Sequence, residues 1–244
     1  IDKLTNVEIF RDSNLTAENI LEFGADRVFI ATGSTWRRDL AGHISPHSVP
    51  VADGEAIFTP DDIFAGAELS GPIIVYDDDH YFMGGALAER FARAGHAVTL
   101  VTPHTMVSAW TEMTNEQSFI QKQLLELEVE IVCTRRIGEI ARHDVTLECV
   151  YTSRTTTLPR ENIVLVTGRT ANRRLHGQLM DCKTSWADAG VKAVERIGDC
   201  LQPSTIADAV HSGHRVAREL GSSGINQPIW RERPAIIASK EAMA

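Results

Sequence analysis

Apolar and polar residues alternate along this chain with two different periods. Short runs rich in β-branched residues predict buried strands, and segments whose apolar residues recur every three or four positions predict helices. The predicted strands lie at residues 27–31, 73–75, 97–101, 130–133, 145–151 and 163–166. The main predicted helices lie at residues 17–23, 117–127 and 206–220. Strands that alternate with helices are typical of an α/β fold built on a parallel sheet.

Capping residues support several of these helix boundaries. Thr16 precedes the first helix as an N-cap, and Gly24 follows its last residue. Thr59 is expected to cap a further short helix, and Thr114 with Gln117 has the spacing of a capping box. Local sequence therefore predicts where these helices begin and end.

Residues 72–102 have the pattern of the strand, turn, helix and strand of a dinucleotide-binding unit. In such units a GxGxxG sequence lets backbone N–H groups approach a pyrophosphate at the positive end of a helix. The glycine positions fall within residues 79–84, where this chain has Asp79, Tyr81 and Gly84. Only the third glycine is kept, so the unit is predicted to be Rossmann-like with a degenerate fingerprint.

Three consecutive acids, Asp77, Asp78 and Asp79, form the turn of this unit, here called the acidic turn. Carboxylates suit the N-terminus of a helix, so we expect them to take the place of the missing ligand and to complement the helix dipole. A metal site is the less favoured interpretation, because no nearby acid or histidine has the spacing of calcium or zinc ligands. About 20 residues after a fingerprint, where an acid would bind ribose, the chain has Thr102 and Pro103.

Composition narrows the function classes. The chain has 244 residues, 43% hydrophobic and 23% charged, as in a globular protein with one or two cores. A net charge of −9 and scattered basic residues argue against a nucleic-acid partner. No apolar run approaches the roughly 20 residues of a membrane span, and the first residues do not have the pattern of a signal peptide. We therefore expect a cytoplasmic protein that makes no membrane contact.

The spacing of the cysteines predicts their chemical state, and the first residue suggests that the chain is part of a larger protein. The cysteines are too far apart for a CxxC motif, so buried thiols are expected rather than disulfides, zinc or an iron–sulfur cluster. They are Cys133, Cys149, Cys182 and Cys200. Ile1 is not an initiating methionine, and we expect the chain to begin within a larger protein.

Two similar turns flank the Rossmann-like unit. One buried strand enters Thr32 and Gly33 in the sequence IATGS, and another enters Gly168 in LVTGR. A third turn, Gly198 and Asp199, precedes the last helix. There the helix N-terminus offers N–H donors and the aspartate accepts from ribityl or ribose hydroxyls of a flavin or nucleotide. The alternative is a simple turn aspartate, and the other two turns favour the cofactor interpretation.

An inserted domain explains this symmetry. The predicted organisation is an FAD/ADP-binding-like domain in two parts, residues 1–70 and 169–244, with a NAD(P)-binding-like Rossmann domain inserted at residues 71–168. Residues 35–58 contain Gly and Pro breakers with little periodicity, which predicts a surface excursion. The apolar residues of the helix from residue 206 fall on a single stripe. Residues 221–244 are expected to form an extended C-terminal arm.

These segments, in this order, resemble flavoproteins of the disulfide-reductase type, with the first βαβ unit of the flavin domain missing. More closely, VYDDDHYFMGGALAERFARAGHAVTLVT, VLVTGR and IGDCLQPSTIADAVHSGHRVAREL resemble the C-terminal region of the trimethylamine, dimethylamine and histamine dehydrogenases. The resemblance covers nearly the whole chain and includes the acidic turn.

The resemblance implies a larger enzyme. In that family an N-terminal barrel related to old yellow enzyme carries FMN beside a 4Fe-4S cluster, so both groups are expected only in the missing N-terminal part. The implied reaction is oxidative N-demethylation or deamination of a small amine, with electrons passed to a protein acceptor such as electron-transfer flavoprotein. The full enzyme is expected to be a homodimer and this segment alone to be inactive, and no catalytic residue or metal ligand is assigned to it.

By the same resemblance, ADP or FAD would bind in the incomplete domain, whereas NAD(P) is not expected at the acidic turn. The implied contact residues are Ala31, Thr32, Gly33, Gly168, Gly198 and Asp199. Two alternatives stay open. In the first, the chain is a non-catalytic structural or docking module. In the second, it is part of an NAD(P)H-dependent flavin oxidoreductase of the 2,4-dienoyl-CoA reductase type, and members of that group keep a glycine-rich turn.

Overall fold

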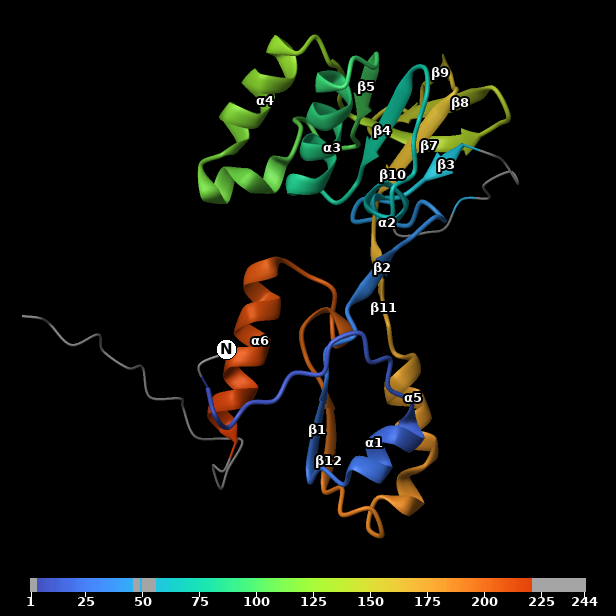
Figure 1. Cartoon of the computed structure of the whole chain (residues 1–244). Coiled ribbons are helices and arrows are strands. Elements are labelled where there is room, and N and C mark those ends of the chain that lie inside the picture. The colour runs from blue at the N-terminus through green and yellow to red at the C-terminus, as the bar shows by residue number, and fades with distance from the viewer. Residues whose placement is uncertain (1–3, 46–48, 50–55, 221–244) are drawn as a thin grey trace, which may run out of the picture.

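Two α/β units joined by a narrow neck make up the computed structural model, which describes residues 4–45, 49 and 56–220 (Figure 1). The large unit contains the described residues between 37 and 168. The small unit contains residues 4–33 and 172–220. The two units lie at opposite ends of the neck, so each has its own core.

The large unit is built on a parallel sheet. Its five strands run in the order β3 (Ile57–Phe58), β10 (Asn162–Val166), β4 (Ile73–Asp77), β5 (Val98–Val101) and β6 (Glu130–Val132). Every residue of β4 and β10 is buried. Such continuous apolar runs are typical of parallel strands that are covered on both faces. The predicted strand at 73–75 is confirmed and extends to Asp77.

Helices cover one face of this sheet and a small antiparallel sheet covers the other (Figure 1). The helical layer consists of α2 (Pro60–Phe64), α3 (Phe82–Arg93), η1 (Ala109–Thr114) and α4 (Gln117–Glu126). The antiparallel layer consists of β7 (Arg135–Ile140), β8 (Asp144–Cys149) and β9 (Thr155–Pro159). Val75 and Val164 belong to the core beneath the helices, and Ile74 and Ile163 to the core beneath the antiparallel strands.

The small unit has a parallel sheet of only two strands. Its elements are α1 (Ala17–Phe23), β1 (Arg27–Ile30), α5 (Arg174–Asp181), η2 (Lys183–Ser185), β12 (Ala193–Arg196), η3 (Gly198–Cys200) and α6 (Ile206–Glu219). Ile20 of α1 and Leu179 of α5 pack against Ile30 in a small core. Helix α6 lies to the side of the strands away from α5 (Figure 1).

The neck is one antiparallel pair, β2 (Ser34–Trp36) and β11 (Arg169–Ala171), in which Trp36 pairs with Arg169. Strand β1 leads directly into β2, and β10 leads directly into β11. The carboxyl ends of one strand from each unit therefore meet at the neck.

Helix capping was predicted correctly at some ends and wrongly at one. Thr16 caps α1 by accepting a hydrogen bond from Asn19 N, and Gly24 ends it in the left-handed conformation, as predicted. The capping box at Thr114 is wrong, because Thr114 Oγ1 donates to Thr111 O and Glu116 is the residue before α4. The turn formed by η1 satisfies that hydroxyl before α4 begins.

The described residues of the range 35–58 are not simply the surface excursion that their breakers predicted, and residues 46–48 and 50–55 of that range lie outside the described residues. Leu40 is 1% exposed and packs in the core beneath β7 and β8. Strand β3 pairs with β10, so it and α2 pack with the large sheet although they precede the predicted boundary at residue 71. Residues 155–159, where no strand was predicted, form the edge strand β9. These corrections all come from pairing or packing between segments distant in sequence.

The close approach of α3 to β4 makes a testable prediction. A Cβ atom built on Gly84 would lie 2.4 Å from Asp77 Cγ, whereas one built on Gly177 of α5 meets nothing within 4 Å. Gly84→Ala should lower the free energy of unfolding by about 1–3 kcal/mol through overpacking. Gly177→Ala, the matched control, should raise it by about 0.5–1 kcal/mol because alanine favours the helix. Urea unfolding measures both, and equal effects of the two changes would contradict the packing at Gly84.

Candidate functional site

The carboxyl ends of β1 and β12 form the first candidate site. These ends lie side by side, since the strands are parallel and Ile197 N donates to Ile30 O at 2.9 Å. In open α/β sheets, ligands bind beyond the carboxyl ends of the strands. Residues 31–33 follow β1, and Gly198 and Asp199 follow β12. The structure therefore brings five of the six predicted contact residues to one edge.

Asn172 and Cys200 join this edge, and sequence reasoning missed both. Thr32 Oγ1 donates to Asn172 O at 2.7 Å, and Asn172 N donates to Gly33 O at 2.9 Å. Cys200 Sγ lies 3.2 Å from Thr32 Oγ1 and donates to Asn172 O at 3.1 Å. Their only sequence signal is proximity to the LVTGR and Gly-Asp turns, which does not specify that they meet.

Gly168 lies apart from the other five predicted residues. It directly precedes β11, at the end of the neck that adjoins the large unit. Its N–H donates to Ala41 O at 2.8 Å, and its carbonyl accepts from Arg37 N at 2.9 Å. A Cβ at this position would lie 2.7 Å from Ala41 O. Glycine is therefore required here by contact with the segment after β2, within the large unit.

Asp199 is the best-connected side chain at the β1–β12 edge. Its Oδ2 accepts from Ser34 Oγ at 3.0 Å and from Arg169 Nη1 at 2.9 Å. Its Oδ1 accepts only a long bond, 3.4 Å, from Ser204 N. A carboxylate has about four acceptor sites, so Oδ1 keeps capacity for a ligand hydroxyl.

Arg169 links this site to the neck. Its Nη2 donates to Ser204 O at 2.8 Å, and its guanidinium carbon lies 5.1 Å from the centre of the Trp36 ring. That distance is in the range of a cation–π contact. The arginine follows Gly168 in the LVTGR turn, but only the antiparallel pairing of β2 with β11 places it over Trp36 and beside Asp199.

The acidic turn lies at the carboxyl edge of the large sheet, and its first acid takes up the N–H groups of the turn. Asp77 is fully buried, and its Oδ1 accepts from Asp79 N at 3.1 Å and from His80 N at 3.0 Å. Burial raises its pKa to about 7, against the opposing effects of His80 and these N–H groups. The carboxylate lies against Gly84 in the first turn of α3.

Asp78 points to a different segment and fixes the loop after β2. Its carboxylate oxygens accept from Ile44 N at 2.9 Å and from Ser45 N at 3.1 Å. His80 Nε2 lies 3.0 Å from Asp78 Oδ1, with both side chains buried. This loop therefore covers the turn at the place where a ligand would approach α3.

Asp79 is also buried, which raises its pKa, while the positive charges of Arg169 and His43 act against that shift. His43 lies 4.5 Å from the ring of Trp110, and the rings of His80 and His104 are 5.3 Å apart. Across the described residues, no group of three or more His, Cys, Asp or Glu side chains is arranged to hold a metal ion. The three acids thus point to different segments, although His80 contacts both Asp77 and Asp78.

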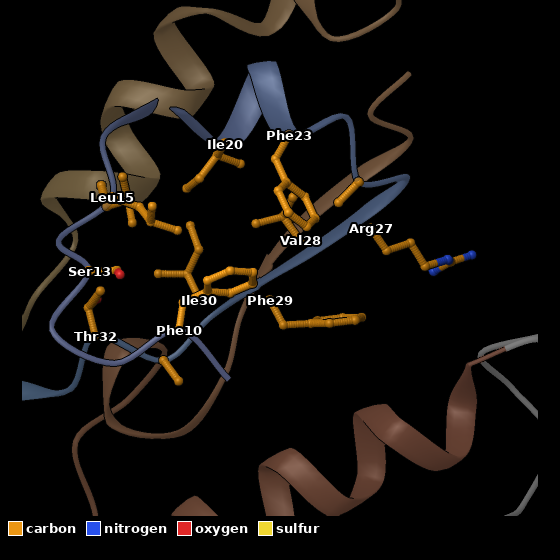
Figure 2. A pocket seen from close by; sticks show the side chains of 13 residues that line it. Phe10, Ser13, Leu15, Ile20, Phe23, Arg27, Val28, Phe29, Ile30 and Thr32 are labelled. Carbon is orange, nitrogen blue, oxygen red and sulfur yellow. The ribbon is translucent and has the colours of Figure 1, made fainter. Parts of the chain in front are cut away.

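An apolar groove of about 640 Å³ lies along β1 in the small unit (Figure 2). Aromatic and aliphatic side chains from the segment before α1, from α1 and from β1 face one another across it. They include Phe10, Leu15, Ile20, Phe23, Val28 and Ile30. Phe23 is 72% exposed, and in the described part of the chain β1 pairs with no strand other than β12. This surface is apolar and uncovered.

Helix α6 also exposes apolar residues of its predicted stripe. Ile206 is 84% exposed and Val210 63% exposed, and only Val216 of the helix is buried. The stripe therefore adds to the uncovered apolar surface of the small unit.

The cysteines are all free thiols, but the prediction that they are buried is correct for only two of the four. Cys149 and Cys200 are buried, whereas Cys133 and Cys182 are partly exposed. Within the described ranges, no helix is both long and apolar enough to cross a membrane.

The fold is an α/β fold built on a parallel sheet, and the flavoprotein disulfide reductase RclA from Escherichia coli has a similar fold at 16% identity and a TM-score of 0.55. Residues 58–177 match the family model of the OYE-like second alpha/beta domain. The chain is 33% identical over 227 residues to dimethylamine dehydrogenase from Hyphomicrobium sp. (strain x). The aligned region covers 84% of this chain and 31% of that enzyme.

Solved structures agree with this similarity. Histamine dehydrogenase from Rhizobium sp. 4-9 shares 40% identity and a TM-score of 0.90, over 93% of this chain and 36% of that one. The 6-hydroxypseudooxynicotine amine oxidase from Pseudomonas geniculata N1 shares 34% identity and a TM-score of 0.84, over 91% of this chain and 33% of that one. The chain belongs to the family of dimethylamine and histamine dehydrogenases, which confirms the predicted resemblance, and it spans about a third of their length.

The buried Asp77 predicts a pH-dependent stability. Its carboxyl has a pKa of about 7 in the folded chain, against an ordinary value of 3.8, so folding favours the protonated form. The stability from this group is present below about pH 4 and is lost as the pH rises through about 7. Asp77→Asn keeps an acceptor for the two N–H groups without the charge, and should reduce the fall in melting temperature between pH 5 and pH 8.

The control for this prediction is Asp188→Asn, which removes one exposed carboxylate from the small unit. It should leave the pH dependence as in the wild type. A wild-type melting temperature that rises over the same range, unchanged in Asp77→Asn, would contradict the assigned environment of Asp77.

Proposed function

We propose that this chain is the C-terminal, nucleotide-binding-like portion of an amine dehydrogenase that carries FMN and a 4Fe-4S cluster. The parent enzyme would oxidise a small amine by N-demethylation or deamination and pass electrons to a protein acceptor such as electron-transfer flavoprotein. The observation that carries the proposal is the match to dimethylamine and histamine dehydrogenases over most of this chain. No catalytic residue is assigned to this segment, which we expect to be inactive alone.

The nucleotide expected in this segment is ADP or FAD, at the β1–β12 edge. The turn at residues 31–33, Gly198 and Asp199 meet at the carboxyl ends of parallel strands, which is where such ligands bind. Asp199 Oδ1 has room to accept a hydroxyl hydrogen bond. When bound, such a group supplies binding energy through its adenosine and phosphates, and these residues would orient its sugar hydroxyls.

The iron–sulfur cluster does not fit the described residues of this chain, and by the family resemblance FMN belongs with the cluster. A 4Fe-4S cluster takes four thiolate ligands brought together, and here the described residues contain no such grouping of cysteines. We therefore assign both groups to the N-terminal barrel of the same enzyme. The barrel is the main proposed partner, and the complete enzyme is proposed to be a cytoplasmic homodimer.

NAD(P) does not fit the acidic turn. Asp77 takes the N–H groups of Asp79 and His80, and Asp78 holds the loop at residues 44–45 over the turn. A pyrophosphate would meet buried carboxylates where a working fingerprint offers N–H donors. This argues against the NAD(P)H-dependent flavin oxidoreductase alternative.

A structural or docking module is the second candidate function. The observation that favours it is the uncovered apolar surface of the small unit, with the groove along β1 and the exposed Ile206 and Val210 of α6. Parallel strands normally have both faces covered, so this surface is suited to packing against another part of a larger protein.

Nucleotide content separates these candidates. Pure protein, denatured and filtered, should release an adenine nucleotide detectable by chromatography and mass spectrometry if the leading proposal holds, and none if the chain serves only for packing. Calorimetric titration with NADH and NADPH should give no binding. Tight binding of NADH or NADPH would contradict the interpretation of the acidic turn and favour the reductase alternative.

The parent enzyme is tested by the coding sequence that precedes Ile1. We expect it to encode a barrel, a cluster of cysteines and then a GxGxxG unit. A preceding sequence that encodes no barrel would contradict the amine dehydrogenase proposal without affecting the nucleotide test.

A further inference from the structure

We infer that Arg169 is a positioning residue for nucleotide binding at the β1–β12 edge, where it holds Asp199 with one carboxylate oxygen turned to a sugar hydroxyl. This inference rests on the proposed nucleotide site. It adds a residue from the neck to a site that the sequence placed only in the turns after β1, β10 and β12.

The two oxygens of Asp199 have different roles. Oδ2 is occupied by Arg169 Nη1 at 2.9 Å and Ser34 Oγ at 3.0 Å, whereas Oδ1 has only the 3.4 Å bond from Ser204 N. The charge-assisted bond at Oδ2 keeps the side chain in one orientation. Oδ1 is thereby left for a donor that the chain does not supply, such as a ribose or ribityl hydroxyl.

Arg169 is itself held in place by three contacts of different kinds. Nη2 donates to Ser204 O, the guanidinium lies over the Trp36 ring, and Nη1 binds Asp199. The backbone of Arg169 is fixed by its pairing with Trp36 in the neck. A planar guanidinium can make these contacts together, whereas a lysine ammonium offers one charged point without a stacking plane.

The surrounding charges favour this orientation. Arg169 and Asp199 form an ion pair with side chains only about one-fifth exposed, so solvent screens the pair weakly. Asp79 of the acidic turn is buried in the large unit, and the positive charge of Arg169 acts against the rise in the pKa of Asp79 that burial causes. The side-chain hydrogen bonds of Arg169 go to Asp199 and Ser204 of the small unit.

The test uses the full 244-residue chain and equilibrium dialysis against ADP, 2′,3′-dideoxy-ADP and FAD. Arg169→Ala should weaken binding of the nucleotide that the wild type binds by about tenfold, the effect of losing one charge-assisted contact. Arg169→Lys should recover part of this loss. The control Arg174→Ala removes an exposed positive charge from the start of α5 and should bind as the wild type does.

The dideoxy analogue tests whether Arg169 acts through a ribose hydroxyl. If Arg169 only stabilised the fold, removal of the ribose hydroxyls would weaken binding equally in the wild type and in Arg169→Ala. If ADP is bound through its ribose, removal of the ribose hydroxyls should weaken binding to the wild type and have little further effect in Arg169→Ala. If the loss in Arg169→Ala is confined to FAD, the hydroxyl belongs to the ribityl chain, and the inference still stands. Melting temperatures of all variants establish that each is folded.

The failures are distinguishable. A wild-type chain that binds neither ADP nor FAD overturns the proposed nucleotide site together with this inference. Binding that is unchanged in Arg169→Ala, or weakened equally in Arg174→Ala, overturns only the role of Arg169.

Discussion

The burial of three consecutive carboxylates at the end of β4 is the constraint on which the large unit depends. A buried carboxylate costs several kcal/mol unless hydrogen bonds or opposite charges compensate it. Asp77 is compensated by N–H groups of its own turn, and Asp78 by those of Ile44 and Ser45. The loop after β2 lies over the turn because its N–H groups donate hydrogen bonds to the buried carboxylate of Asp78. Gly84 is required because the side chain of Asp77 occupies the space beside it. One local charge pattern thus determines the conformation of two segments distant in sequence.

In the proposed function, the same hydrogen bonds to the acidic turn distinguish the two units by the ligands that they can bind. At the large sheet, the donors that would meet a pyrophosphate already bind an internal carboxylate, so a strand edge of the type that holds dinucleotides is chemically closed. At the small sheet, Asp199 retains an open acceptor and its edge carries no comparable acidic turn. Since the neck joins the two carboxyl edges, Arg169 is placed within reach of acids from both units.

Local sequence predicts what local interactions determine, and this explains which expectations held. Thr16 and Gly24 define α1 through contacts within a few residues, and the apolar run from Ile73 defines β4 wherever it is placed. Leu40 and β9 were missed because their structure comes from partners far along the chain, as is also true of the contact between Arg169 and Asp199. In the candidate site the turns were predictable, since each follows a strand end, but the order of strands that brings them together was not.

The small unit shows why a chain of this length leaves one core incomplete. A parallel pair of strands has no internal means of covering its second edge, and β1 and β12 have neither a third strand nor a helix over the groove among the residues described. If the chain folds without a partner, the side chains of Phe23, Ile206 and Val210 stay exposed. Burying a large apolar side chain stabilises a protein by about 1.5–3 kcal/mol. The large unit has no such deficit in its sheet, since β4 and β10 are buried on both faces. The apolar surface is therefore confined to the unit whose strand edge retains an open acceptor, so whatever covers the groove along β1 also lies next to the proposed nucleotide site.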